Sequence, residues 1–295
     1  MHADEVSEVL HLDGWTGPFA AADRHTARAA LEAGRVVVLP GLAFATEPAE
    51  AAFLNAGAAD GSRKNISFDP ASGRCHGSGL DPERLLALAA MLDRFARAAD
   101  GLVRGLVPAY AASLQRARAS FRPAEISGRR YSPRHDDRRL HVDAFPSRPL
   151  QGRRILRVFT NIAADGAPRA WQIGEPFADH ATRFLPRLCR PLPGAALLLD
   201  VLGITKGRRS AYDHVMLGLH DAAKRDAAYQ HSAPRADIAF PPGTTWLCFT
   251  DAVVHAVRAG HSALEQTLHL PVAAMAERGG TPLGILEGLT GRALV

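Results

Sequence analysis

Residues 140–162 read LHVDAFPSRPLQGRRILRVFTNI, and this stretch decides how the rest of the sequence is interpreted. It holds two short apolar strand patterns, LHVDAF and RILRVFTNI, separated by a turn rich in proline, glycine and arginine. Further strand patterns are ISGRRYS from Ile126, PRAWQI from Pro168, TTWLCFTDAVVHAV from Thr244 and QTLHLPV from Gln266. Many short strands separated by turns favour a barrel-like sandwich of sheets backed by helices.

The N-terminal part of the chain has a mainly helical pattern. Residues 22–34 show helical periodicity and precede a short strand pattern, RVVVLPGL. The clearest helix pattern begins at Asp81, has Pro82 at its first position and extends to about Arg118. Pro108 should kink or divide this helix, because proline lacks the backbone N–H that a helix interior needs.

These patterns predict a single α+β domain over residues 1–295. Residues 1–121 form its mainly helical N-terminal part, and residues 122–275 form a β-rich core with a helical insertion at about 175–240. The Gly- and Ser-rich stretch 57–80 is expected to be a long surface loop, and loops of that length are often functional.

The composition excludes several classes of protein. Lys and Arg number 35 against 30 Asp and Glu, a net charge of +5 that gives little reason to expect a nucleic-acid partner. Three cysteines without a CxxC pair exclude a disulfide scaffold and a structural zinc cluster. The sequence shows neither a secretory signal pattern nor an apolar run of about 18 residues, so we expect a cytoplasmic protein without a spanning segment.

Three residues form a candidate metal site. His141 and Asp143 occupy positions i and i+2 of the apolar strand pattern LHVDAF, so their side chains point the same way. His255 lies on a second apolar strand pattern, VVHAV. Two imidazoles and one carboxylate are the facial triad of non-haem Fe(II) oxygenases, which leaves coordination positions open.

Spacing alone does not single out this set. His-x-Asp also occurs at 2–4, 11–13 and 135–137, but these pairs lie in acidic or strongly hydrophilic surroundings. A buried histidine with a hydrogen-bonding partner is the other interpretation of His255. Four histidines are rival third ligands, and His269 is the strongest of them: His220, His231, His261 and His269.

The strand pattern at 153–162 contains an unusual cation. Alternation places Ile155, Arg157, Phe159 and Asn161 on one face. If that face lines the interior, Arg157 is a buried cation beside the metal and needs an anion such as a dicarboxylate. If the strand is an edge, Arg157 is simply solvated.

The sequence resembles the 3-deoxy-D-manno-oct-2-ulosonic acid (Kdo) 3-hydroxylases of Gram-negative bacteria, which are 2-oxoglutarate/Fe(II)-dependent dioxygenases. Five segments carry the resemblance and together cover most of residues 63–270: RKNISFD (63–69), DDRRLHVDAFPSRPLQGRRILRVFTNI (136–162), RAWQIGEPF (169–177), RSAYDHVMLGLHDAAKRDAAYQ (209–230) and TWLCFTDAVVHAV (245–257). HVDAFPSRP and RVFTNI are not general dioxygenase patterns, which makes the likeness specific.

The resemblance implies a fold and an activity. The core would be a double-stranded β-helix, or jelly roll, with flanking helices, and His141, Asp143 and His255 would hold Fe(II). The enzyme would be an oxidoreductase that hydroxylates the Kdo sugar of Kdo-lipid A at C3 in lipopolysaccharide modification. It would consume 2-oxoglutarate and O2 and release succinate and CO2.

The sequence departs from one common dioxygenase feature. Many 2-oxoglutarate dioxygenases hold the distal carboxylate with an arginine eleven residues after the second histidine, and this position is Gln266 here. We therefore expect Arg157 to bind 2-oxoglutarate, with Asn161, Trp171 and Gln266 as pocket neighbours. Arg169 shares the alternation of Trp171 and is the reserve candidate.

The implied substrate is anionic and lipid-linked. Arginines gather around the first metal strand, at 122, 130, 134, 138, 139 and 148, and we expect Arg122 and Arg148 to bind the substrate. A second candidate patch, which could act as a lid, is Lys206, Arg208, Arg209 and Tyr212. The lipid-linked substrate implies peripheral association with the cytoplasmic face of the inner membrane.

Other functions use the same three ligands. They are a 2-oxoglutarate hydroxylase of another substrate, a zinc hydrolase with metal-bound water as nucleophile, and a non-catalytic metal-binding jelly roll. An inward-facing Arg157 separates the oxygenases from the last two, because neither of those needs a cation near the metal.

Overall fold

Two β-sheets form the centre of the computed structural model, which describes residues 1–61, 64–128 and 131–295. The strands are β1 (Ser7–Val9), β2 (Val36–Leu39), β3 (Ile66–Asp69), β4 (Arg74–His76), β5 (Gln115–Arg122), β6 (Arg154–Asn161), β7 (Arg169–Ile173), β8 (Ala236–Phe240), β9 (Thr245–Phe249), β10 (His255–Ala259) and β11 (Ala263–Leu270). The large sheet has the order β1-β2-β9-β6-β11-β5-β3-β4, and the small sheet has the order β10-β7-β8. All pairs are antiparallel except β1 with β2.

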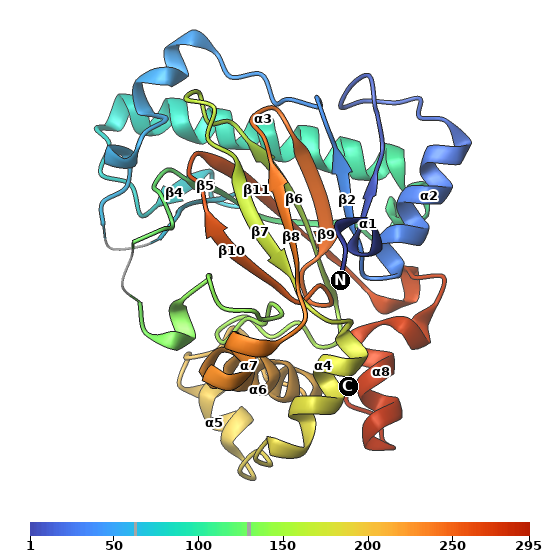
Figure 1. The fold of residues 1–295 in the computed structure, drawn as a ribbon. Helices are drawn as coiled ribbons and strands as arrows, with labels where there is room; N and C mark the ends of the chain where they lie inside the picture. The colour runs from blue at the N-terminus through green and yellow to red at the C-terminus, as the bar shows by residue number, and fades with distance from the viewer. Residues whose placement is uncertain (62–63, 129–130) are drawn as a thin grey trace.

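Helices lie on one face of the large sheet and at one end of the molecule (Figure 1). They are α1 (Ala3–Val6), α2 (Ala21–Glu32), α3 (Pro82–Leu106), α4 (Phe177–Phe184), α5 (Ala195–Val201), α6 (Ala211–Arg225), α7 (Ala227–Ser232) and α8 (Pro282–Thr290). In Figure 1, α3 runs across the top, and α4 to α8 gather at the opposite end. Across the described ranges, we find no helix with the length and apolarity that crossing a membrane requires.

Helix α3 begins where the sequence predicts and ends earlier. The Asp81 side chain caps it by accepting a 2.9 Å hydrogen bond from the Arg84 N–H, and Pro82 occupies the first turn. The helix ends at Leu106 because Pro108 disfavours helical geometry in the residue before it. The predicted extension to about Arg118 is therefore wrong, and residues from Gln115 onward belong to β5.

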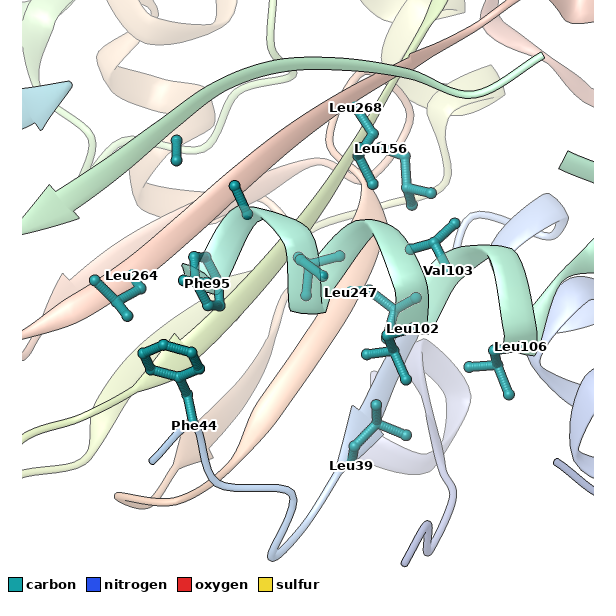
Figure 2. Packing of buried hydrophobic residues seen from close by; sticks show 14 of the residues in the cluster. Leu39, Phe44, Phe95, Leu102, Val103, Leu106, Leu156, Leu247, Leu264 and Leu268 are labelled. Carbon is teal, nitrogen blue, oxygen red and sulfur yellow. The ribbon is translucent and has the colours of Figure 1, made fainter. Parts of the chain in front are cut away.

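The core lies between α3 and the large sheet. Phe95, Leu102 and Val103 of α3 are fully buried, and Figure 2 shows them among leucines of the sheet strands. These partners include Leu156 of β6 and Leu264 of β11. The other face of the same strands is thereby left to line the site.

Two predicted strands are absent, and five strands lie where none was predicted: β1, β3, β4, β5 and β8. Residues 126–128 and 131–132 of ISGRRYS form no strand, because the Glu125 carboxylate accepts the N–H groups of Ile126 and Ser127 and holds a turn. LHVDAF forms a single bridge, between His141 and His255. The stretch 57–80, predicted to be a loop, contains β3 and β4.

The N-terminal part shares the large sheet with the core. It supplies β1 to β4 and all but one residue of β5, so the boundary predicted between residues 121 and 122 falls inside that strand. Helices α4 to α7 occupy Phe177 to Ser232, and β8 begins at Ala236, inside the range predicted to be helical.

Candidate metal centre

His141, Asp143 and His255 lie together at the junction of the two sheets. Each offers a ligand atom, and these atoms lie within 4.8 Å of one another. Reciprocal backbone hydrogen bonds of 3.0 and 2.8 Å join His141 to His255, and the Asp143 N–H donates to Thr250 O at 2.8 Å. The two histidine rings have centroids 4.6 Å apart. The structure thus brings together the three residues that the sequence analysis selected.

Backbone carbonyls orient both imidazoles. His141 Nδ1 donates to Arg139 O at 2.7 Å, and His255 Nδ1 donates to Val253 O at 2.9 Å. A proton on Nδ1 leaves the lone pair of Nε2 free, as a metal ligand requires. Burial lowers the pKa of both histidines, so both rings are neutral at pH 7.

Asp143 supplies the negative charge. Burial alone would raise its pKa, but the Arg157 cation and the other polar groups around the carboxylate together outweigh that effect and lower the pKa to about 2. Arg157 Nη1 lies 3.2 Å from Asp143 Oδ2, yet that oxygen receives no hydrogen bond within the described part of the chain. An ionised carboxylate and two free Nε2 atoms form a donor set that fits Fe(II).

A cavity of about 240 Å³ opens beside the three residues. Its lining holds four cations and two carboxylates among polar, aromatic and small residues: Lys64, Asn65, Arg122, Asp137, His141, Asp143, Arg157, Phe159, Arg169, Trp171, His255 and Val257.

The predicted inward face of β6 is confirmed at its centre. Arg157 and Phe159 line the cavity, whereas Leu156 and Val158 pack into the core below α3. Arg157 Nη1 also lies 3.2 Å from Glu265 Oε1. Arg157 is therefore an enclosed cation between two carboxylates and not a solvated edge residue.

Asn161 does not contact the cavity, although it shares the face of Arg157. Its amide donates at 2.9 Å to both Ala167 O and Phe240 O, and its oxygen accepts the Ala163 N–H. All its hydrogen-bonding groups thus hold the end of β6, and the predicted role in binding a co-substrate is wrong.

Gln266 points to the opposite face of β11. It pairs with Val158 in the register of β6 and β11, is fully buried, and donates to Ala117 O at 3.1 Å. The neighbouring Glu265 faces the site instead, and its Oε2 lies 2.5 Å from Arg122 Nη2. The prediction that Gln266 lines the pocket is therefore wrong, and the residue before it, Glu265, faces the site. The sequence did contain a signal for Glu265, because it is a lone acidic residue within an apolar strand pattern.

Trp171 is a cavity residue, as predicted. Its ring stacks on His255 with centroids 5.1 Å apart, and its Nε1–H has no acceptor among the described residues. Arg169, two positions earlier on β7, also lines the cavity. Its Nη1 donates to Gly260 O at 2.7 Å, and no carboxylate in the described ranges forms an ion pair with it.

The electrostatics of Arg169 differ from those of its neighbours. Burial and the nearby Arg122 cation lower the pKa of Arg169 to about 9, so the guanidinium is still charged at pH 7. A buried guanidinium without an anion is costly. Arg169 is thus the cavity cation with the strongest need for an anionic ligand.

The two arginines expected to bind substrate, Arg122 and Arg148, lie in different environments in the structure. Arg122 lines the cavity, where Glu265 holds it. Arg148 is exposed and is not among the cavity residues, so its role in binding the substrate stays a prediction. Of the other clustered arginines, Arg134 pairs with Asp221 and Arg138 with Asp136, whereas Arg130 lies outside the described residues.

Two lysines near the metal site were missed. Lys64 and Lys224 lie 3.0 and 3.6 Å from Asp137 Oδ1, and Lys64 and Asp137 line the cavity. The chain has only three lysines, Lys64, Lys206 and Lys224, and this scarcity among 35 basic residues was the available signal.

The rival histidines do not join the metal set. His269 contacts Phe145, and His261 pairs with Asp165 at 3.0 Å. His220 comes nearest, with its ring centroid 5.4 Å from that of His141, but its Nδ1 bonds Asp221. Tyr212, expected in a surface patch, is buried in the core between α4 and α6.

Comparisons with known proteins agree with this geometry. The family model described as 3-deoxy-D-manno-oct-2-ulosonic acid (Kdo) hydroxylase matches residues 15–293. The chain is 45% identical to the Kdo hydroxylase KdoO, a non-haem Fe(II) α-ketoglutarate-dependent dioxygenase. The crystal structure of KdoO with α-ketoglutarate and Fe(III) covers 98% of this chain and 97% of its own, with a TM-score of 0.94.

KdoO crystal structures with other ligands match equally well. The complex with cobalt(II) has a TM-score of 0.95 and the complex with succinate and Fe(III) one of 0.94, each over 98% of this chain and 97% of the other. No significant match occurs among curated proteins.

Proposed function

This chain belongs to the Kdo hydroxylase family of Fe(II)/2-oxoglutarate-dependent dioxygenases, and we propose that it hydroxylates C3 of the Kdo sugar in Kdo-lipid A. The single observation that carries this proposal is the meeting of His141, Asp143 and His255 within 4.8 Å beside a cation-lined cavity. Succinate and CO2 are the co-products.

His141, Asp143 and His255 are the proposed ligands of Fe(II). When bound with 2-oxoglutarate and O2, the iron supplies the oxidising chemistry that inserts one oxygen atom into a C–H bond. The protein holds both imidazoles in the tautomer that presents Nε2 and keeps Asp143 ionised through Arg157. The stacked Trp171 ring fixes the plane of His255.

Arg157 and Arg169 are the proposed anchors of 2-oxoglutarate. Arg157 lies beside the metal ligand Asp143, and Arg169 is buried on the adjacent wall without a carboxylate partner in the described chain. Two guanidinium groups can hold a carboxylate through paired, charge-assisted hydrogen bonds. This arrangement replaces the arginine that many dioxygenases have at the position of Gln266.

The charge of the cavity favours an anionic sugar. The cavity lining holds four cations, Lys64, Arg122, Arg157 and Arg169, against the carboxylates of Asp137 and Asp143, a surplus of two positive charges. Fe(II) raises the surplus to four, and the two carboxylates of 2-oxoglutarate lower it to two. The carboxylate of Kdo offsets one of the remaining charges, and Arg122 and Lys64 are the cations proposed to meet it.

Three further points complete the proposal. The two sheets form a double-stranded β-helix in which the metal residues lie at one end. The enzyme associates peripherally with the cytoplasmic face of the inner membrane, because its substrate is lipid-linked and its net charge of +5 suits an anionic surface. It has no nucleic-acid partner.

Mass spectrometry of Kdo-lipid A tests the proposed reaction. Incubation with the enzyme, Fe(II), 2-oxoglutarate and O2 should add one oxygen atom to the sugar, with succinate formed in equal amount. Fragment ions should place the oxygen at C3 of Kdo. Succinate formation without any change in the lipid would point to a 2-oxoglutarate hydroxylase of another substrate.

A further inference from the structure

A cluster of exposed apolar side chains surrounds α5. Of eleven exposed large apolar residues in the described chain, six lie within thirteen consecutive positions: Leu192, Leu197, Leu198, Val201, Leu202 and Ile204. Leu192 is 77% exposed and Val201 75%. We call these six residues the α5 patch. Single exposed leucines are ordinary, but a contiguous group of this kind marks an interaction surface.

The patch is built on backbone that satisfies its own hydrogen bonds. Leu202 N–H donates to Leu198 O at 3.0 Å, Gly203 N–H to Asp200 O at 2.9 Å, and Ile204 N–H to Leu199 O at 3.0 Å. Backbone groups that are paired internally can leave water at little cost, which is a requirement for entering lipid.

Basic residues border the patch. Between residues 188 and 210 the chain has four basic residues, Arg190, Lys206, Arg208 and Arg209, and one acidic residue, Asp200. Arg190, Lys206 and Arg208 are exposed. An apolar surface with a cationic border matches the boundary between the acyl chains and anionic headgroups of a bilayer.

The base of the patch is attached to the chain that follows the metal ligands. Lys206 N–H donates to Ser147 O at 2.8 Å, Gln151 Nε2 donates to Arg208 O at 3.2 Å, and Arg209 donates to Pro146 O. Ser147 lies four positions after Asp143. In Figure 1, α5 lies at the end of the molecule away from α3, beside α6 and α7.

We infer that the α5 patch and its basic border are a membrane-docking surface that inserts into the headgroup–acyl boundary of an anionic bilayer. The inference rests on the proposed function, since a lipid-linked Kdo sugar must be reached at such a boundary. The attachment to residues 146–151 holds the docking surface and the metal site in a constant relation. The enzyme can thus act on the sugar while the acyl chains stay in the membrane.

Vesicle co-sedimentation of the full chain tests this inference. The vesicles are phosphatidylcholine alone, or phosphatidylcholine and phosphatidylglycerol in equal amounts. The protein should bind the mixed vesicles, and added salt should weaken this binding. Changing Leu192, Val201 and Leu202 together to serine should weaken binding by about tenfold or more. Failure of the unaltered protein to bind the mixed vesicles overturns the inference.

A matched control separates this surface from general hydrophobicity. Leu86 and Leu289 are exposed leucines elsewhere, 73% and 45% accessible, and changing both to serine should leave vesicle binding unchanged. An equal loss in this control contradicts a role for the patch. Self-association of the protein would also contradict the inference if the patch substitutions abolished it while vesicle binding persisted. In that case the patch would bind a second copy of the chain and not a membrane.

Turnover distinguishes docking from the proposed reaction. The patch variant should retain turnover of a soluble Kdo glycoside without acyl chains and lose turnover of Kdo-lipid A in mixed vesicles. Equal turnover of vesicle-bound lipid by both proteins contradicts docking through α5. Vesicle binding can be measured without enzymatic activity. The docking inference can therefore be tested even if the proposed substrate is wrong.

Discussion

Two backbone carbonyls set the chemistry of the metal centre at the scale of single residues. By accepting the Nδ1 protons of His141 and His255, Arg139 O and Val253 O leave both Nε2 atoms free. The Arg157 guanidinium is the largest of several influences that keep Asp143 ionised against the effect of burial. Each ligand therefore has a neighbour that prepares its coordinating atom before any metal arrives.

His255→Ala should abolish both Fe(II) binding and hydroxylation, because it removes one of three ligands. His269→Ala is the control, since His269 lies outside the metal set and should leave metal binding unchanged. Titration with Fe(II) under anaerobic conditions, with 2-oxoglutarate present, measures this through the visible absorption of the complex. If only the His269 variant lost that absorption, the third metal ligand would be His269 and not His255.

Arg169→Gln should raise the KM for 2-oxoglutarate by roughly tenfold to a hundredfold, because a charge-assisted pair is worth about 1.5–3 kcal/mol. The KM for the Kdo substrate should change far less. Arg157→Ala should act in the same direction and also lower kcat, because it removes the cation beside Asp143. Arg148→Gln is the control, since Arg148 lies outside the cavity. Equal changes in both KM values would contradict the assignment.

At the scale of elements, α3 supports the strands that carry the site. The inner face of this helix is fully buried against β6, β9 and β11, whereas Leu86 near its start is 73% exposed. Arg157 and Glu265 project from the opposite face of β6 and β11. Packing under these strands thus determines where the cavity cations and carboxylates stand.

Phe95→Ala should lower the free energy of unfolding by about 3–5 kcal/mol, because it leaves a cavity in a fully buried layer. Leu86→Ala on the same helix should change it by less than about 0.5 kcal/mol, since that side chain is exposed. Urea unfolding followed by circular dichroism measures both values. Similar losses in the two variants would show that α3 does not pack as described.

At the scale of the whole molecule, buried titratable groups couple folding to pH. Burial lowers the pKa of His269 from 6.5 to about 4. The unfolded chain therefore binds a proton in this window that the folded chain does not, and stability is lost as the pH falls. Asp143, with its pKa lowered to about 2, contributes stability above pH 3.8 that is lost on further acidification.

The metal-free protein should therefore lose stability between pH 6.5 and 4. His269 accounts for at most about 3 kcal/mol of this loss, and for less to the extent that its ring is exposed. The measurement is urea unfolding at several pH values with a chelator present. His269→Asn should flatten the dependence in this window. An unchanged slope in that variant would show that His269 does not titrate as described.

Several features follow from the sequence because they depend on local geometry. The alternation of side chains along a strand places Arg157 and Phe159 on one face, and Asp81 with Pro82 marks the start of α3. The His-x-Asp pair, together with His255, predicts the three metal ligands, and longer motifs indicate the family. The strand alternation and the helix start each depend on a few neighbouring residues, whereas the assignment of His255 and of the family draws on segments far apart in the sequence.

The tertiary structure alone decides which neighbour surrounds each side chain. The register of β11 against β6 turns Glu265 toward the site and Gln266 toward the core, and a one-residue shift would exchange them. Asn161 is engaged by carbonyls of two distant segments, and Arg169 is left without an anion. The leucines of α5 were an apolar run in the sequence, and only the absence of a covering element in the described fold makes them a surface. Burial and pairing depend on chain segments far apart in sequence, which local patterns do not encode.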